Sequence, residues 1–218
     1  MTGRGHQAPH LDCRSTQEVA AEVRGLMAAG EVEAARERYG TIVDALQRRA
    51  NRLALYYLRN VADADEAVQD AFVKAYLHLD SYNPALSFDV WFLRILVNGC
   101  LDRVKARTRR ARWMVALGDL GPPGTFDEPD TPADEPTPED VLLRTERADE
   151  LARAIATLPD RQRTVVLLSQ LDGRSTREVS QITGLNESTV RVHLFRALRR
   201  LRGTIGRPAE DVARGSDR

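Results

Sequence analysis

Residues 175–202 read STREVSQITGLNESTVRVHLFRALRRLR, and this stretch predicts a helix, a turn and a second helix. Ser175 and Glu178 form a capping box that begins the first helix. Gly184 lies in the turn, and Asn186 caps a last helix that reaches about Arg202. Two helices joined by a short turn containing glycine are typical of helix-turn-helix domains that bind DNA.

The last helix combines an apolar face with an outer face that carries almost only arginine. A solvated surface helix would add Glu at four-residue spacing, so this face is poorly balanced unless a polyanion neutralises it. The competing interpretation is a solvated basic helix. Arg191 and Arg196 lie where a recognition helix enters the major groove and could bridge guanine O6 and N7. For Phe195, a core position and contact with a thymine methyl group are both open. The predicted DNA contacts are Ser175, Thr176, Arg177, Ser188, Thr189, Arg191, Val192, Phe195, Arg196 and Arg199.

Charge is distributed unevenly, although 32 basic and 32 acidic side chains cancel. Residues 103–112, RVKARTRRAR, carry six cations and no acid, and residues 191–202 also contain no acid. Between them, residues 118–140 carry eight acids, no base and six of the ten prolines. Apolar residues are too sparse there to offset chain entropy, which predicts a mobile linker. Two basic elements separated by an acidic spacer indicate two DNA contacts on one polypeptide.

Upstream of the linker, apolar residues again follow helical spacing. Asp63 and Glu66 predict an acidic capping box for one helix, and another helix runs from about Phe88 into the basic stretch. The buried positions expected in that helix are Trp91, Ile95 and Leu101. The predicted fold is all-α, with two small helical domains joined by a flexible, acidic, proline-rich linker, the second domain containing the helix-turn-helix. The expected parts are an N-terminal extension with a short helix (1–29), a first domain (30–115), the linker (116–140), a second domain (141–204) and a polar tail (205–218).

Several classes of protein are disfavoured by the sequence. No apolar run approaches the roughly 20 residues that span a bilayer, and residues 1–13 lack the apolar core of a signal peptide. Cys13 and Cys100 are too few for a disulfide framework and give no metal-ligand spacing. No glycine-rich phosphate loop or pairing of a nucleophile with a base is visible. We therefore expect a cytoplasmic protein without catalytic residues, metal, cofactor or membrane insertion.

Four motifs follow one another along the chain. They are DADEAVQDAF (63–72), FDVWFLRILVN (88–98) followed by Asp102 and the basic cluster, LPDRQR (158–163) and the helix-turn-helix (175–202). In this order they resemble the extracytoplasmic function (ECF) sigma factors, members of the sigma-70-like family of bacterial RNA polymerase sigma factors. Two departures from the family pattern are visible. Glu66 and Asp70 reverse the usual Asp and Glu, and Val192 replaces a small polar residue, which leaves the base preference at that position open.

The resemblance implies a sigma factor that binds core RNA polymerase and directs promoter-specific transcription initiation. Asp65, Glu66, Gln69 and Asp70 would dock on the clamp coiled coil of the largest polymerase subunit. The second domain would read the −35 element through the contacts named above and bind the flap of the second largest subunit. The helix after the acidic motif would melt and read the −10 element as a single strand. For Phe88 and Trp91 a core position is the competing, and favoured, interpretation. The −10 contacts implied are Phe88, Trp91, Arg94, Asn98, Arg103, Lys105, Arg107, Arg109 and Arg110.

Other functions compete with this one. A helix-turn-helix transcriptional regulator would need a receiver domain or ligand pocket upstream, which the N-terminal half does not supply. A polymerase-binding adaptor would bind core polymerase without promoter selectivity. Family habit also implies a cognate anti-sigma factor that clamps the two domains and hides both basic surfaces. The promoter sequence, the regulon and the inducing signal do not follow from the sequence.

Overall fold

The computed structural model describes residues 13–116 and 150–204, and the regular elements within these ranges are all helices. The chain divides into two compact units, Met1–Asp127 and Glu128–Arg218, and each is described by itself. The all-α prediction is confirmed. Residues 1–12, 117–149 and 205–218 lie outside the described residues, and these include the polar tail and all of the expected linker (116–140) except Ala116, the last residue of a helix. Within the described residues, no helix is long and apolar enough to cross a membrane.

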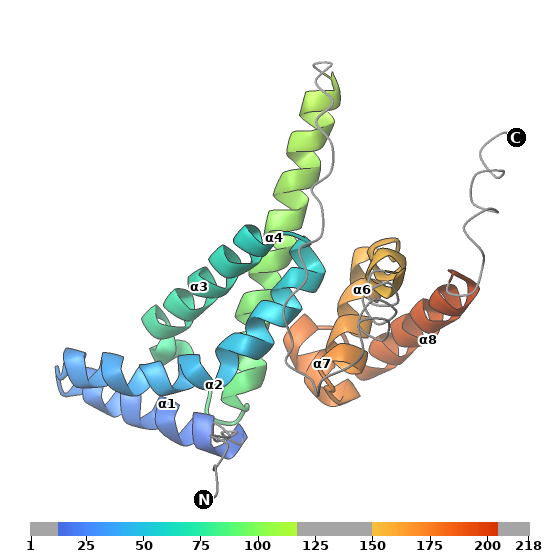
Figure 1. The fold of residues 1–218 in the computed structure, drawn as a ribbon. Helices are drawn as coiled ribbons and strands as arrows, with labels where there is room; N and C mark the ends of the chain where they lie inside the picture. Colours follow the sequence, from blue (N-terminus) through green and yellow to red (C-terminus); the bar gives the residue numbers. More distant parts are fainter. Residues whose placement is uncertain (1–12, 117–149, 205–218) are drawn as a thin grey trace, which may run out of the picture. The chain divides into compact units, whose positions relative to one another are not determined.

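The first unit is a bundle of four helices (Figure 1). Gly30, with φ of 79°, makes the tight connection between the first two helices. The C-terminal part of the fourth helix projects beyond its neighbours in this unit (Figure 1). The elements are α1 (Cys13–Ala28), α2 (Val32–Leu58), α3 (Val61–Leu77), a 3-10 turn (Leu79–Ser81) and α4 (Phe88–Ala116).

Helix α1, predicted to lie in an N-terminal extension, packs against α2 and α4 of the first unit. Val19, Ala20 and Val23 are buried in this contact. Thr16 Oγ1 donates a hydrogen bond of 2.9 Å to Oδ1 of the buried Asp89 at the start of α4. The first unit therefore has α1 as part of its core.

The N-terminal cap of α3 differs from the sequence prediction. The helix begins at Val61, and Asn60 Oδ1 accepts a hydrogen bond of 2.8 Å from the Asp63 backbone N–H. Asn60 is therefore the cap, and the capping box predicted from Asp63 and Glu66 is wrong. Asp63 lies inside the first turn, and the Glu66 side chain is directed to another helix.

The core of the first unit is built around the N-terminal half of α4. Phe92 is buried and stacks on Phe72 of α3 at a ring distance of 4.5 Å. The expected buried set of Trp91, Ile95 and Leu101 is wrong, because all three are half-exposed. Helix α4 contacts α1, α2 and α3, so its buried surface is wider than one stripe. The buried positions are Phe88, Val90, Phe92, Leu93, Leu96, Val97 and Cys100.

The second unit contains the predicted helix-turn-helix. Ser175 Oγ accepts from the Glu178 backbone N–H while Glu178 accepts from the Ser175 backbone N–H, which confirms the capping box. Gly184 ends the helix in the left-handed conformation with φ of 72°, and Asn186 Oδ1 caps the next helix through Thr189 N–H at 2.8 Å. The described elements are helical residues 150–156, α6 (Asp160–Val166), a π-helical segment (Leu167–Leu171), α7 (Thr176–Thr183) and α8 (Glu187–Thr204).

Candidate nucleic-acid interface

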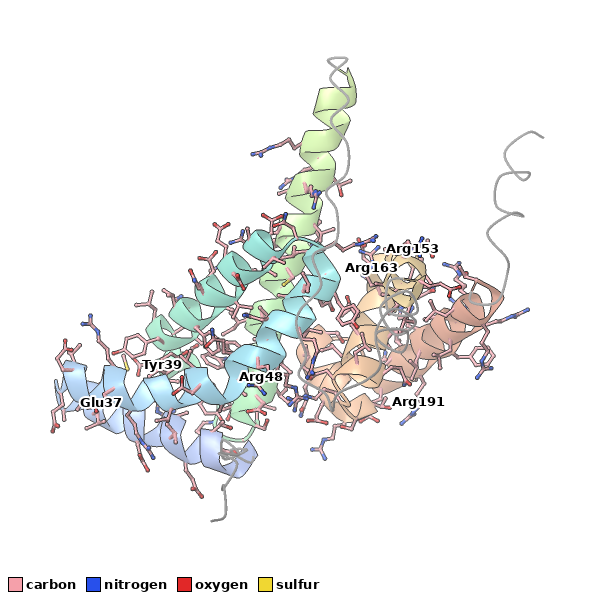
Figure 2. The ribbon with its side chains drawn as sticks, in the orientation of Figure 1. Glu37, Tyr39, Arg48, Arg153, Arg163 and Arg191 are labelled. Carbon is pink, nitrogen blue, oxygen red and sulfur yellow. The ribbon has the colours of Figure 1, made fainter. Side chains whose placement is uncertain are left out.

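Helix α8 presents the predicted arginine-rich face to solvent. Val190, Ala197 and Leu201 are buried on its inner side. Phe195 is 68% exposed, so it lies on the outer face and not in the core. Figure 2 labels Arg191, one of the outer side chains. The positions exposed on this face are Ser188, Arg191, Val192, Phe195, Arg196, Arg199 and Arg200, with Thr189 half-exposed beside them.

One carboxylate on α8 was missed by the sequence argument. Glu187 lies four residues before Arg191, and its Oε2 is 3.0 Å from the Arg191 guanidinium. The statement that this face lacks a glutamate at four-residue spacing is therefore wrong. Exposed pairs of this kind contribute about 0–1 kcal/mol, so Arg191 can exchange Glu187 for a stronger partner.

A buried arginine, which was not singled out from the sequence, joins the start of α7 to the segment that precedes it. Arg174 Nε lies 3.0 Å from Asp172, and its terminal nitrogen lies 2.8 Å from Glu178. Burial raises the pKa of Glu178, but hydrogen bonds from Arg174 and Ser175 outweigh it and hold that pKa below its ordinary value. Ser175 is exposed but its hydroxyl is engaged in the cap, whereas Arg177 is exposed and Thr176 half-exposed.

The predicted −10 residues of α4 divide between two sides of the helix. Arg94, Asn98, Lys105 and Arg109 are exposed and recur at helical spacing on one side, with the half-exposed Trp91 at its start. We call these five residues the α4 stripe. It combines cations, an amide and an aromatic ring, which are the groups that hold phosphates and unstacked bases.

Phe88, Arg103 and Arg107 do not belong to the α4 stripe. Phe88 is fully buried and packs against Tyr82 and Trp91, so direct contact with DNA would require it to leave the core. Arg107 donates to the Leu58 backbone carbonyl at 3.4 Å. Arg103 faces α3, where its guanidinium binds two carboxylates. Arg110 is exposed. It follows Arg103 by seven residues, about two turns of the helix, so it lies on the same side of α4 as Arg103 and not on the α4 stripe.

The acidic residues of α3 form an exposed face whose carboxylates are held by neighbouring helices. Asn51 Nδ2 of α2 donates to Asp65 Oδ1 at 3.2 Å. Arg103 of α4 binds Glu66 Oε2 at 3.1 Å and Asp70 Oδ2 at 2.6 Å. Hydrogen bonding to Glu66, partly opposed by burial, raises the pKa of the Arg103 guanidinium. We call Asp65, Glu66, Gln69 and Asp70 the α3 acidic face.

Two exposed apolar side chains extend the α3 acidic face and were not singled out from the sequence. Val73 and Leu77 are both more than half exposed. They follow Glu66 and Asp70 at intervals of three and four residues, so the four lie along one side of the helix. An apolar extension beside acidic groups suits a protein partner better than a nucleic acid.

Two family models match the chain: Sigma-70 region 2 over residues 42–110 and Sigma-70, region 4 over residues 148–201. The ECF RNA polymerase sigma-E factor of Escherichia coli K12 is 31% identical over 161 residues, 69% of this chain and 83% of the relative. The chain belongs to the ECF sigma factors. The sigma factor is also 29% identical to SigW of Bacillus subtilis over 166 residues, 76% of this chain and 88% of that relative.

Solved structures share the fold of this sigma factor. The sigma factor RpoE of Bartonella quintana, solved with the anti-sigma factor NepR, aligns with a TM-score of 0.60 at 19% identity and covers 78% of this chain and 98% of that one. CnrH, solved with the cytosolic domain of CnrY, aligns with a TM-score of 0.60 at 23% identity, over 88% of this chain and 96% of that one. As an ECF sigma factor, the chain is a promoter-recognising sigma factor of RNA polymerase, and the relatives given above are named as RNA polymerase sigma factors.

Proposed function

We propose that the two units of this sigma factor divide promoter recognition between α8 and α4. The outer face of α8 enters the major groove of the −35 element, with Arg191 and Arg196 on base edges. The observation that carries this assignment is the exposed, arginine-rich surface of α8, which also presents Phe195 to solvent. In this proposal residues 30–115, together with α1, form the −10 and polymerase-binding domain. Residues 116–140 form the linker, and residues 141–204 form the −35 domain.

The α4 stripe binds the −10 element as a single strand in this proposal. Lys105 and Arg109 neutralise phosphates, while Trp91 and Asn98 are placed to stack on and hydrogen-bond an unstacked base. Phe88 supports Trp91 from the core, because the two rings lie 5.6 Å apart. Opening of the promoter then needs no chemistry from this chain, only binding that favours the melted state.

The α3 acidic face binds the clamp coiled coil of the largest polymerase subunit, and the second unit binds the flap of the second largest. We expect the double change Glu66→Gln and Asp70→Asn to weaken binding of core polymerase roughly tenfold or more, because charge pairs at an interface are lost. Fluorescence anisotropy of the labelled sigma factor with core polymerase measures this. The matched control is Glu37→Gln with Asp44→Asn, two exposed acids of α2, which should leave the affinity unchanged. Equal losses in both variants would contradict a specific role for α3.

Transcription in vitro tests the proposed division as a whole. Core polymerase from the source organism is supplied with fragmented genomic DNA, with and without this protein. New discrete transcripts that share two upstream elements are the expected result. Binding to core polymerase without new transcripts would favour a polymerase-binding adaptor. No binding to core polymerase would favour a helix-turn-helix transcriptional regulator.

We also propose that an anti-sigma factor sequesters this chain, since the Bartonella quintana sigma factor of similar fold was solved with one. Such a partner would cover the α4 stripe and the outer face of α8. The proposal includes a cytoplasmic location and no catalytic activity of the chain itself, because polymerase supplies the chemistry. Affinity purification of the native protein from unstressed cells should recover a stoichiometric partner besides polymerase, and recovery of polymerase alone would contradict this part.

A further inference from the structure

Arg103 lies behind the α3 acidic face, between α3 and α4. One terminal nitrogen binds Glu66 Oε2 at 3.1 Å and the other binds Asp70 Oδ2 at 2.6 Å, so a single guanidinium joins side chains one helical turn apart. The Arg103 side chain is 28% exposed, whereas those of Glu66 and Asp70 are 65% and 54% exposed. The arginine is therefore recessed, and the carboxylates project outward from it.

The helical phase of α4 separates Arg103 from the residues proposed to bind DNA. Arg103 follows Arg94 by nine residues, which is about two and a half turns at roughly 3.6 residues per turn. It therefore lies on the opposite side of the helix from Arg94. Asn98 and Lys105 also lie on nearly the opposite side of the helix from Arg103. A strand of nucleic acid along the α4 stripe would not reach the guanidinium, which is turned to α3.

We propose that Arg103 is a positioning residue of the polymerase-docking surface and not a DNA contact. It holds Glu66 and Asp70 by one oxygen each, and leaves the second oxygen of each carboxylate directed to a basic partner surface. Asn51 holds Asp65 in the same way from α2, by a hydrogen bond of 3.2 Å. The inference rests on the proposed docking of α3 on core polymerase and specifies how that surface is organised.

Fixing these side chains before binding reduces the entropy lost on association. A long acidic side chain that becomes immobile at an interface costs part of the binding free energy, and a neighbour that immobilises it in the free protein removes that cost. A cleft of about 290 Å³ between α3 and α4 has Asp70 and Arg103 among its lining residues. Because Lys74 and Arg103 also line this cleft, a basic side chain of the partner is expected to meet Asp70 on the exposed side of its carboxylate and not inside the cleft.

The test compares Arg103→Gln with Lys105→Gln in the full-length protein. We expect Arg103→Gln to weaken binding to core polymerase about tenfold, because two acidic side chains become mobile. Lys105→Gln removes a cation two positions away, on the α4 stripe, and should leave core affinity unchanged. Unchanged or tighter core binding by Arg103→Gln, with the wild type bound normally, overturns the inference. Absence of core binding by the wild type would instead overturn the proposed function.

Salt dependence separates positioning from DNA contact. For the assembled holoenzyme on promoter DNA, Lys105→Gln should reduce the slope of log affinity against log salt by about one, as expected when one phosphate contact is lost. Arg103→Gln should leave this slope unchanged, and a reduction by one would overturn the inference. In the Glu66→Gln, Asp70→Asn background, Arg103→Gln should cause no further loss of core affinity. If Arg103→Gln melts below the assay temperature, Arg103→Lys replaces it, with a loss of roughly threefold expected because an ammonium lacks the planar fork.

Discussion

Promoter-specific transcription is expected to fall at least about thirtyfold when Arg191 and Arg196 are both replaced by alanine. Each guanidinium that bridges O6 and N7 of a guanine contributes about 1–3 kcal/mol of discrimination, so two contribute about 2–6 kcal/mol. Both side chains are exposed on α8. When Arg191 binds a base it loses only its surface ion pair with Glu187, which contributes little to stability. Multi-round transcription from a promoter found with the wild-type protein measures the loss.

The control removes the same number of charges from the same helix. Arg200→Ala with Arg202→Ala lies nearer the C-terminus of α8 and outside the proposed contact set. This variant should lose activity less than about fivefold, with most of the loss restored at lower salt, since such residues act through the general phosphate field. If both double variants lost activity equally at every salt concentration, α8 would be a non-specific basic surface.

The helix-turn-helix could be predicted because its signals are local in sequence. The Ser175 cap, the turn at Gly184 and the Asn186 cap each depend on residues within four positions of one another. Burial on α8 followed the same logic, since one face packs inward and the other meets solvent. The sequence leaves the environment of Phe195 open, because an aromatic residue at the edge of an apolar face fits both the core and the solvent-exposed surface.

Helix α4 was harder to predict, since three helices pack against it. Periodicity indicates which residues share a side of a helix but not how many sides are buried. Trp91 was therefore expected inside, where Phe92 and Leu96 are found instead. The contacts of Arg103 with Glu66 and Asp70 span more than thirty positions in sequence. A run of cations gave no indication that Arg103 binds carboxylates of another helix while Lys105 and Arg109 are exposed on the other side of α4.

The second large effect is expected from Arg174→Ala, which should destabilise the second unit by about 3–5 kcal/mol. The side chains of Arg174 and Asp172 are each only 4% exposed, and the guanidinium joins Asp172 at 3.0 Å to Glu178 at 2.8 Å. Removal of one member of a buried ion pair leaves a desolvated charge without its opposite. Since Arg174 immediately precedes the Ser175 cap, the helix-turn-helix should open with it.

The aromatic residues allow this loss to be assigned to one unit. Trp91, Trp113 and all five tyrosines precede residue 117, so intrinsic fluorescence reports on the first unit. Hydrogen exchange of peptides from residues 160–200 reports on the second. Arg174→Ala should accelerate exchange there roughly a hundredfold or more and leave the fluorescence melting curve unchanged. Arg177→Ala, an exposed neighbour, should change the stability by less than about 0.5 kcal/mol.

The stability of the second unit, measured by hydrogen exchange, should depend on pH because of Glu178. Its pKa is lower in the folded protein than in the unfolded chain, so its carboxylate stabilises the fold above the unfolded pKa. This stabilisation is lost as the pH falls through the lower, folded pKa. Arg174→Ala removes the main cause of the low pKa, so the difference in stability between the variant and the wild type should be largest near neutral pH and become smaller in acid. A difference that persisted undiminished at pH values where Glu178 is protonated would mean that Arg174 stabilises the second unit through Asp172 and packing, and not through its pair with Glu178.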